Sequence, residues 1–206
     1  CLIANATMAD RAVRPSSESP DASHSIGDEY VLLEKIGEGS FGRVFKALQK
    51  IGADGEASDL VVAIKCVPAE QDSGEVAREI ETLKKCQSPN IVQYYGSFVR
   101  GNELWIVMEY CSGSSLSDIM EASKQPFAEV QIAAVLAGTI DGLQYLHSLN
   151  QIHRDVKAGN LLLNEAGTVK IADFGVSAKL SDTISRRGTV IGTPFWMAPE
   201  VISGGP

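Results

Sequence analysis

The chain has 206 residues, of which 44% are hydrophobic, and a formal net charge of −8. This size suits one large domain or two small ones, and the acidic balance argues against nucleic acid or anionic membranes as partners. No apolar run approaches the roughly 20 residues that cross a bilayer, and the four cysteines lack paired or metal-ligand spacing, which favours a reduced, cytoplasmic protein.

The first 29 residues have the composition of a disordered leader. Five serines and two prolines lie between residues 15 and 25, and large apolar side chains are few. Such a segment cannot bury enough surface to offset the entropy lost on ordering. The sequence begins with Cys1 and its first methionine is Met8, so we expect translation to start there.

A strand–loop–strand pattern with three glycines follows this leader. Residues 30–36 predict a strand, and a second strand follows the last glycine. Gly37, Gly39 and Gly42 would let the backbone approach phosphate groups without Cβ clashes. The same spacing occurs in dinucleotide-binding turns, but those continue into a helix, whereas a strand with Val44 follows here. The flanks therefore favour a phosphate-binding loop between two strands.

Three more strands and one helix complete the first half of the chain. Residues 60–67 predict a strand in which Lys65 follows a run of apolar side chains. This lysine would be expensive to bury unpaired, and a surface lysine on an edge strand is the alternative. A helix from about residue 72 carries an apolar stripe at helical spacing, and residues 91–99 and 104–110 predict two further strands.

A long helix and a short hairpin are expected in the second half. Pro126 precedes a helical pattern, where proline suits a helix start, and the apolar spacing predicts a buried core helix. Residues 161–163 and 168–171 predict a hairpin around the turn at 164–167. The positions expected on the buried face of the helix are Val130, Ala133, Leu136, Ile140, Leu143 and His147.

A dense group of polar residues lies between the long helix and the hairpin. Asp155, Lys157 and Asn160 are offset by two and five residues, and Asp173 comes thirteen residues after Asn160. Asp155 can accept a hydroxyl proton, and Lys157 can neutralise charge on a transferred phosphate. Amide and carboxylate oxygens are ligands that magnesium prefers. The group is the minimal apparatus for phosphoryl transfer.

The pattern His153-Arg154-Asp155-x-Lys157-x-x-Asn160, followed by Asp173-Phe174-Gly175, resembles the catalytic and metal loops of eukaryotic protein kinases. The resemblance implies an α+β, bilobal protein-kinase-like fold. Its N-lobe, a five-stranded sheet plus one helix, would be complete over residues 30–111 with the hinge. Residues 112–206 would form an incomplete helical C-lobe that holds the catalytic loop and the activation segment.

The resemblance also implies a role for each site residue, with ATP and Mg²⁺ as cofactors. Lys65 would contact phosphates and pair with Glu79, or with Glu75 one turn earlier. Asp155 would accept the substrate proton, Lys157 would assist, and Thr193 would hydrogen-bond both. The metal ligands would be Asn160 and Asp173. The residues placed around ATP are Ile36, Gly37, Glu38, Gly39, Ser40, Phe41, Gly42, Val44, Ala63, Lys65, Met108, Glu109, Cys111 and Leu162.

Residues 192–197 resemble the sterile-twenty-like serine/threonine kinases, and residues 189–193 and 109–113 narrow this to Hippo-type germinal-centre kinases. Lys157 favours serine and threonine over tyrosine. The resemblance implies protein substrates with Ser/Thr acceptors in a Hippo-like or stress cascade. Thr189 would be the activating phosphosite, filled by an upstream kinase or by self-activation in trans, and its phosphate would pair with Arg154.

The sequence stops shortly after Ala198-Pro199-Glu200, where the kinase family continues through more helices. We therefore expect the long helix to expose apolar surface and this chain alone to be inactive. A non-catalytic truncated isoform or a regulatory interaction module is the alternative function.

Overall fold

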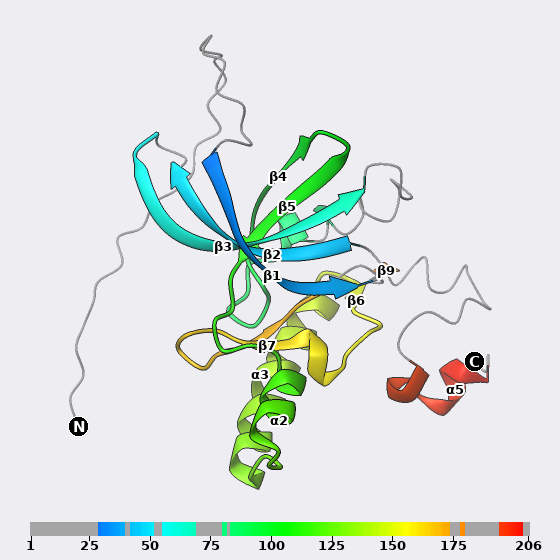
Figure 1. The fold of residues 1–206 in the computed structure, drawn as a ribbon. Helices are drawn as coiled ribbons and strands as arrows, with labels where there is room; N and C mark the ends of the chain where they lie inside the picture. Colours follow the sequence, from blue (N-terminus) through cyan, green and yellow to red (C-terminus); the bar gives the residue numbers. More distant parts are fainter. Residues whose placement is uncertain are drawn as a thin grey trace.

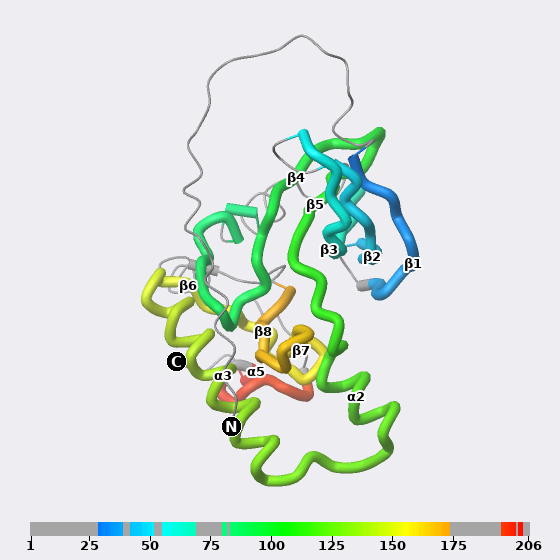
Figure 2. The backbone as a smooth tube through the Cα atoms, turned by 90° about the vertical axis from the view of Figure 1, so that its left-hand side faces the viewer, coloured from blue at the N-terminus to red at the C-terminus, as the bar shows by residue number. Residues whose placement is uncertain are grey.

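The computed structural model describes residues 29–39, 42–51, 55–68, 80–81, 83–173, 178–179 and 194–203. Five antiparallel strands form one sheet in the order β1-β2-β3-β5-β4. In Figure 1 this sheet lies above two helices, α2 (Leu116–Ser123) and α3 (Glu129–Ser148), and the short strand β7 (Leu161–Leu163) lies between the two layers. Figure 2 shows the same arrangement from the side. The strands are β1 (Tyr30–Gly39), β2 (Gly42–Ile51), β3 (Ala57–Pro68), β4 (Tyr94–Arg100) and β5 (Glu103–Glu109).

The five-stranded sheet confirms the predicted N-lobe sheet, although its boundaries differ from the sequence pattern. Strand β1 continues to Gly39 and strand β2 begins at Gly42, because cross-strand pairing extends to these two glycines. Strand β4 begins three residues later than expected. Ile91 instead forms an isolated parallel bridge with Ile171, and the amide of Val92 donates to the carbonyl of Ile171 at 3.0 Å. The segment before β4 is thus bound to the short strand β8 (Val169–Ile171).

Both faces of the sheet are apolar, and they have different partners. Side chains alternate across a strand, so neighbours in β3 belong to different clusters. Val62, Ile64 and Cys66 pack on the outer face with Trp105 and with aromatic rings of β1, β2 and β4. On the inner face Val67 belongs to the core shared with the helical layer. Strand β3 is therefore buried on both sides, which explains its continuous apolar run.

The helical layer contains α2 (Leu116–Ser123) and α3 (Glu129–Ser148), and a short helix, α5 (Pro199–Ile202), comes near the end of the chain. Ser115 caps α2: its Oγ accepts from the amide of Asp118 at 3.1 Å, and the Asp118 carboxylate accepts from the amide of Ser115 at 3.3 Å. The predicted helix from residue 72 is described only at 80–81 and 83–85, where the backbone is helical. Among the described residues no helix is long and apolar enough to cross a membrane.

The predicted buried face of α3 is wrong for most of its positions, since of the six only Leu143 packs against the core. Val130 is 75% exposed, and Leu136 and Ile140 are 51% and 58% exposed. The helix instead packs through the face that carries Thr139, Gly142 and Leu146, and a Cβ at Gly142 would come within 2.8 Å of the Ile171 side chain. Close approach to β8 therefore selects the face, and periodicity of apolar residues could not reveal this. The helix also starts at Glu129, after rather than at Pro126.

A short hairpin joins the layers, and the polar residues that the sequence singled out lie just before and just after it. It consists of β7 (Leu161–Leu163) and β8 (Val169–Ile171), paired antiparallel as predicted. The turn is closed by Asn164, whose Oδ1 accepts from the amide of Thr168 at 2.8 Å. Beside it lie the two-residue strands β6 (Gln151–Ile152) and β9 (Ala178–Lys179), which pair with each other. The segment between β6 and β7 holds Asp155, Lys157 and Asn160.

Candidate active site

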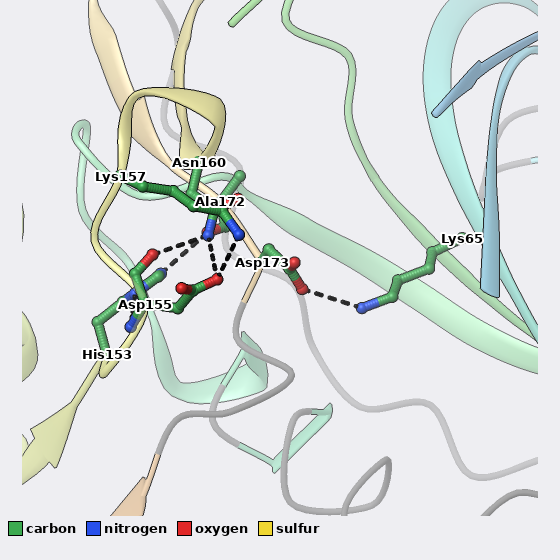
Figure 3. Close-up of polar contacts among 7 residues, drawn as sticks. All are labelled: Lys65, His153, Asp155, Lys157, Asn160, Ala172 and Asp173. Atoms are coloured by element: carbon green, nitrogen blue, oxygen red, sulfur yellow. Dashed lines mark hydrogen bonds and ion pairs between the residues drawn. The ribbon is translucent and has the colours of Figure 1, made fainter. Parts of the chain in front are cut away.

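Asp155 is the centre of a compact polar cluster in the loop between β6 and β7 (Figure 3). Lys157 Nζ lies 2.8 Å from Asp155 Oδ2, and Asn160 Nδ2 donates to the same oxygen at 3.0 Å. The Asn160 amide also donates to the backbone carbonyl of Asp155 at 2.8 Å. The 3₁₀ turn η2 (Ala158–Asn160) supports this geometry, with the amide of Asn160 bonded to the carbonyl of Lys157. The three residues that the spacing predicted are thus brought together.

His153 holds this loop from beneath. The ring is buried, its Nε2 donates to the carbonyl of Ala172 at 2.9 Å, and its Nδ1 accepts from the amide of Asp155 at 3.3 Å. This pair of bonds requires a neutral ring with the proton on Nε2. Burial lowers the pKa of His153, which favours the same neutral form. The histidine thereby ties the Asp155 loop to the segment that carries Asp173.

Two residues of the site have left-handed backbone conformations. Arg154 has φ 70° and Asp173 has φ 62°. Non-glycine residues pay of order 1–3 kcal/mol for sparsely populated backbone conformations, and such residues cluster at functional sites. The strain is maintained by the hydrogen bonds of His153 and by the amide of Ala172, which donates to the carbonyl of Asn160 at 2.9 Å. Arg154 directly precedes Asp155, the predicted proton acceptor, and Asp173 is itself a predicted metal ligand.

Lys65 connects the sheet to the second half of the site. It lies on β3, is 7% exposed, and its Nζ is 3.3 Å from Asp173 Oδ1. The edge-strand alternative is therefore wrong, because β3 is an inner strand between β2 and β5. The Asp173 side chain is 46% exposed, so this carboxylate faces both the lysine and solvent. Figure 3 shows the two side chains reaching toward each other across the gap between the layers.

The side-chain oxygens of Asn160 and Asp173 are of the kind that could hold a magnesium ion together with phosphate. The Nδ2 group of Asn160 is used by Asp155, which leaves its amide oxygen for a metal. Within the part of the chain that the structure describes, no three His, Cys, Asp or Glu side chains form a metal cage. Magnesium typically binds through one or two protein oxygens and completes its shell with substrate phosphates and water.

The residues expected around a purine lie on one face of the sheet and on the hairpin below it. Ala63 is opposite Met108 in the β3–β5 register, and Val44 of β2 is opposite Lys65. Leu162 of β7 forms a bridge to Ser115, and the amide of Leu163 donates to the carbonyl of Ser114, so this strand lies against the segment after the hinge. Val44, Ala63 and Met108 therefore lie on one face of the sheet, and Leu162 lies on the hairpin. Ile36, Glu38 and Gly39 lie on β1, and Cys111 is buried just after β5.

Gly42 is required by the fold itself, a reason that the sequence did not reveal. Its φ is 134°, and a Cβ there would lie 2.2 Å from the carbonyl oxygen of Cys66 on β3. At Gly37 the closest contact of an added Cβ would be an ordinary 3.7 Å, to Val44. Gly42 thus lets β2 pass close to β3, while the packing around Gly37 does not require a glycine.

Sequence reasoning missed a buried ion pair behind the hinge segment, residues 108–111. Lys170 Nζ of β8 lies 2.8 Å from Glu109 Oε2, with side-chain exposures of 10% and 17%. The same oxygen accepts from the amide of Gln93 at 3.1 Å, and the amide of Glu109 donates to the carbonyl of Gln93 at 2.8 Å. The sequence predicted Glu109 only as one of the residues around ATP, with no partner for its side chain. A lysine between valine and isoleucine in a short strand was the available signal.

Several predicted site residues lie outside the described residues, namely Ser40, Phe41, Glu79, Thr189 and Thr193. Of the four cysteines, the structure describes three, and these are free thiols, as their spacing predicted: Cys66, Cys86 and Cys111.

The comparison with known families agrees with this architecture. The model of the protein kinase domain matches residues 30–206, so the chain belongs to that family. Over 171 residues it is 54% identical to the serine/threonine-protein kinase cst-1 of Caenorhabditis briggsae, an alignment that covers 83% of this chain and 33% of that protein. The chain therefore spans about a third of the length of this relative.

Proposed function

We propose that the protein is an ATP-dependent serine/threonine protein kinase, which transfers the γ-phosphate of ATP to Ser/Thr hydroxyls of proteins. The observation that carries the proposal is the cluster around Asp155. One carboxylate oxygen binds both Lys157 and Asn160, while Lys65 and Asp173 meet 3.3 Å apart beside it. The similarity to a relative named as a serine/threonine kinase supports the same acceptor class.

Each side chain of the cluster then has a distinct task. Asp155 orients the acceptor hydroxyl and takes its proton, and the hydrogen bond from Asn160 keeps the carboxylate in place. Lys157 supplies a positive charge next to the acceptor, where the transferred group arrives. Bound magnesium would neutralise phosphate charge, with Asn160 and Asp173 as its protein ligands. Lys65, released from Asp173 when the metal binds that carboxylate, would hold the phosphates.

The sheet and the hairpin supply the nucleotide site in this proposal. Glycine-loop residues from Gly37 to Gly42 would cover the phosphates with backbone amides. The purine would lie between Ala63 above and Leu162 below, with the hinge backbone of Glu109 and Cys111 at its edge. Positioning by these fixed elements, rather than covalent chemistry, would supply most of the rate enhancement.

Regulation by phosphorylation is part of the proposal. Phosphate on Thr189, added by an upstream kinase or by a second copy in trans, would pair with the guanidinium of Arg154. The strained backbone of Arg154, which directly precedes Asp155, supports a regulatory role for this arginine. The sequence motifs around residues 189–197 support a place in a Hippo-like cascade in the cytoplasm.

We further propose that this chain on its own transfers phosphate poorly, which keeps the non-catalytic module as the second candidate. The supporting observation is the exposed apolar face of α3, formed by Val130, Leu136 and Ile140. A large exposed apolar patch favours association with itself or with other proteins over a rigid, soluble monomer.

A phosphorylation assay tests the kinase proposal. The full-length protein, incubated with MgATP and an array of Ser/Thr and Tyr peptides, should label Ser/Thr peptides. Asp155→Asn should lower the rate by at least about a hundredfold, the usual contribution of a general base. His147→Gln, a change on the exposed side of α3, is the matched control. Absence of transfer with undiminished ATP binding would instead favour the non-catalytic module.

A further inference from the structure

Lys46 on β2 makes contacts that have no role in the proposed catalytic site. In the sheet register it lies opposite Ala63, which in turn lies opposite Met108. Directly opposed residues share a face, and Val44 is two residues away on the same strand, so Lys46 is on the inner face with them. Through Ala63 it is in register with Met108 of the hinge segment, and it lies two residues after Val44, which is expected to cover the purine.

The ammonium of Lys46 contacts two other segments of the chain. Its Nζ lies 5.0 Å from the centroid of the Tyr110 ring, which is within the range of a cation–π contact. The same Nζ lies 3.4 Å from Glu34 Oε1 on β1. The Lys46 side chain is 28% exposed, whereas that of Lys35 on β1, which pairs with Glu38 of its own strand, is 49% exposed. Lys46 therefore links β1, β2 and the hinge segment.

We propose that Lys46 and Tyr110 form a clasp that positions a purine nucleoside triphosphate, a role that rests on the proposed kinase function. Val44 and the glycine loop belong to the hairpin that Lys46 holds, and Tyr110 lies between the hinge residues Glu109 and Cys111. The clasp fixes the height of the hairpin above the hinge, and hence the width of the space that the purine enters. Both are positioning residues, because neither is at the reacting phosphate.

The magnitude follows from the kind of contact. A partly exposed cation–π contact corresponds to about a two- to fivefold change in a dissociation constant. The ion pair to Glu34 adds little, because the glutamate side chain is 64% exposed and such pairs are screened by solvent. The effect of removing the clasp is therefore small, specific to nucleotide binding, and the same whichever partner is removed.

The test is a titration of the full-length protein with a fluorescent ATP analogue and Mg²⁺, combined with steady-state kinetics. Lys46→Met, Tyr110→Leu and the double variant should each raise the Kd and the KM for ATP about two- to fivefold, with kcat unchanged. The double variant should be no worse than either single variant, because one contact is lost in all three. Lys46→Arg and Tyr110→Phe should keep the wild-type Kd, since cation and ring remain.

Lys35→Met is the control for removing a positive charge from the same hairpin, and it should leave the Kd unchanged. An unchanged Kd in Lys46→Met or Tyr110→Leu overturns the clasp, and so does an equal increase in Lys35→Met or an additive effect in the double variant. These outcomes leave the kinase proposal intact if the wild-type protein binds and uses ATP. Wild-type protein that binds no ATP overturns both proposals.

Discussion

Replacing Lys170 by methionine would remove one half of the buried ion pair between β8 and the hinge segment. The Nζ–Oε2 distance to Glu109 is 2.8 Å. At an effective dielectric constant of about 20, two unit charges at this separation attract by about 6 kcal/mol, which desolvation of both groups largely offsets. Removing only the lysine leaves the carboxylate buried without its counter-ion, and such a change typically costs about 3–5 kcal/mol.

The environment of Glu109 places the expected loss at the lower end of that range. Its side chain is 17% exposed and keeps the hydrogen bond from the amide of Gln93. We therefore expect Lys170→Met to lower the free energy of unfolding by about 3 kcal/mol, or the melting temperature by roughly 6–12 °C for a protein of this size. The double variant Lys170→Met/Glu109→Gln should recover most of this loss, because the glutamine can still accept from Gln93 and leaves no charge.

Urea unfolding followed by circular dichroism measures all these variants on one scale. The matched control is Lys85→Met, which removes an ion pair with Glu81 whose side chains are 57% and 52% exposed. Exposed pairs contribute about 0–1 kcal/mol, so this control should stay close to the wild type. A Lys170→Met variant as stable as the control would refute the reasoning. So would a double variant no more stable than the single one, since the loss would then not come from a stranded charge.

Three further outcomes follow from the structure. Gly42→Ala should lower the free energy of unfolding by about 2–3 kcal/mol, because its Cβ would meet a backbone carbonyl at 2.2 Å, while Gly37→Ala should cost less than about 1 kcal/mol; equal losses in a urea titration would contradict this. Burial lowers the pKa of His153, so the unfolded chain binds a proton before the folded protein does as the pH falls below about 6.5. The contribution of His153 to the free energy of unfolding is therefore complete above that pH, and below it decreases by up to about 1.4 kcal/mol per pH unit. His153→Gln should flatten this pH dependence and His147→Gln should not; an unchanged slope in His153→Gln would count against it. Thiol labelling at pH 8 should be slow in the folded protein and fast in urea, because burial holds the thiols in their protonated form, and rapid native labelling would be evidence against that burial. The thiols concerned are Cys66 and Cys86, whose pKa is raised to about 11, and Cys111, whose pKa is raised to about 12.

The sequence by itself determined the polar cluster around Asp155 and which strands form the sheet. Asp155, Lys157 and Asn160 lie within six residues of one another, and a local turn suffices to bring them together. The five strands were recognisable because apolar and β-branched residues recur between glycine-containing turns. Such patterns lie within short stretches of chain, so they can be recognised without knowing what packs against these stretches.

Only the tertiary structure decided which faces and partners those elements use. The apolar stripe of α3 predicted one buried face, but the small Gly142 allows close approach to β8 and selects another. The pairing of Lys65 with Asp173 joins residues 108 positions apart, and that of Lys170 with Glu109 joins strands of different sheets. Contacts of this kind depend on how the layers meet, and the sequence pattern of a single element contains no record of its neighbour. How deeply a charge is buried, and hence how much its ion pair contributes to stability, also depends on how the layers pack.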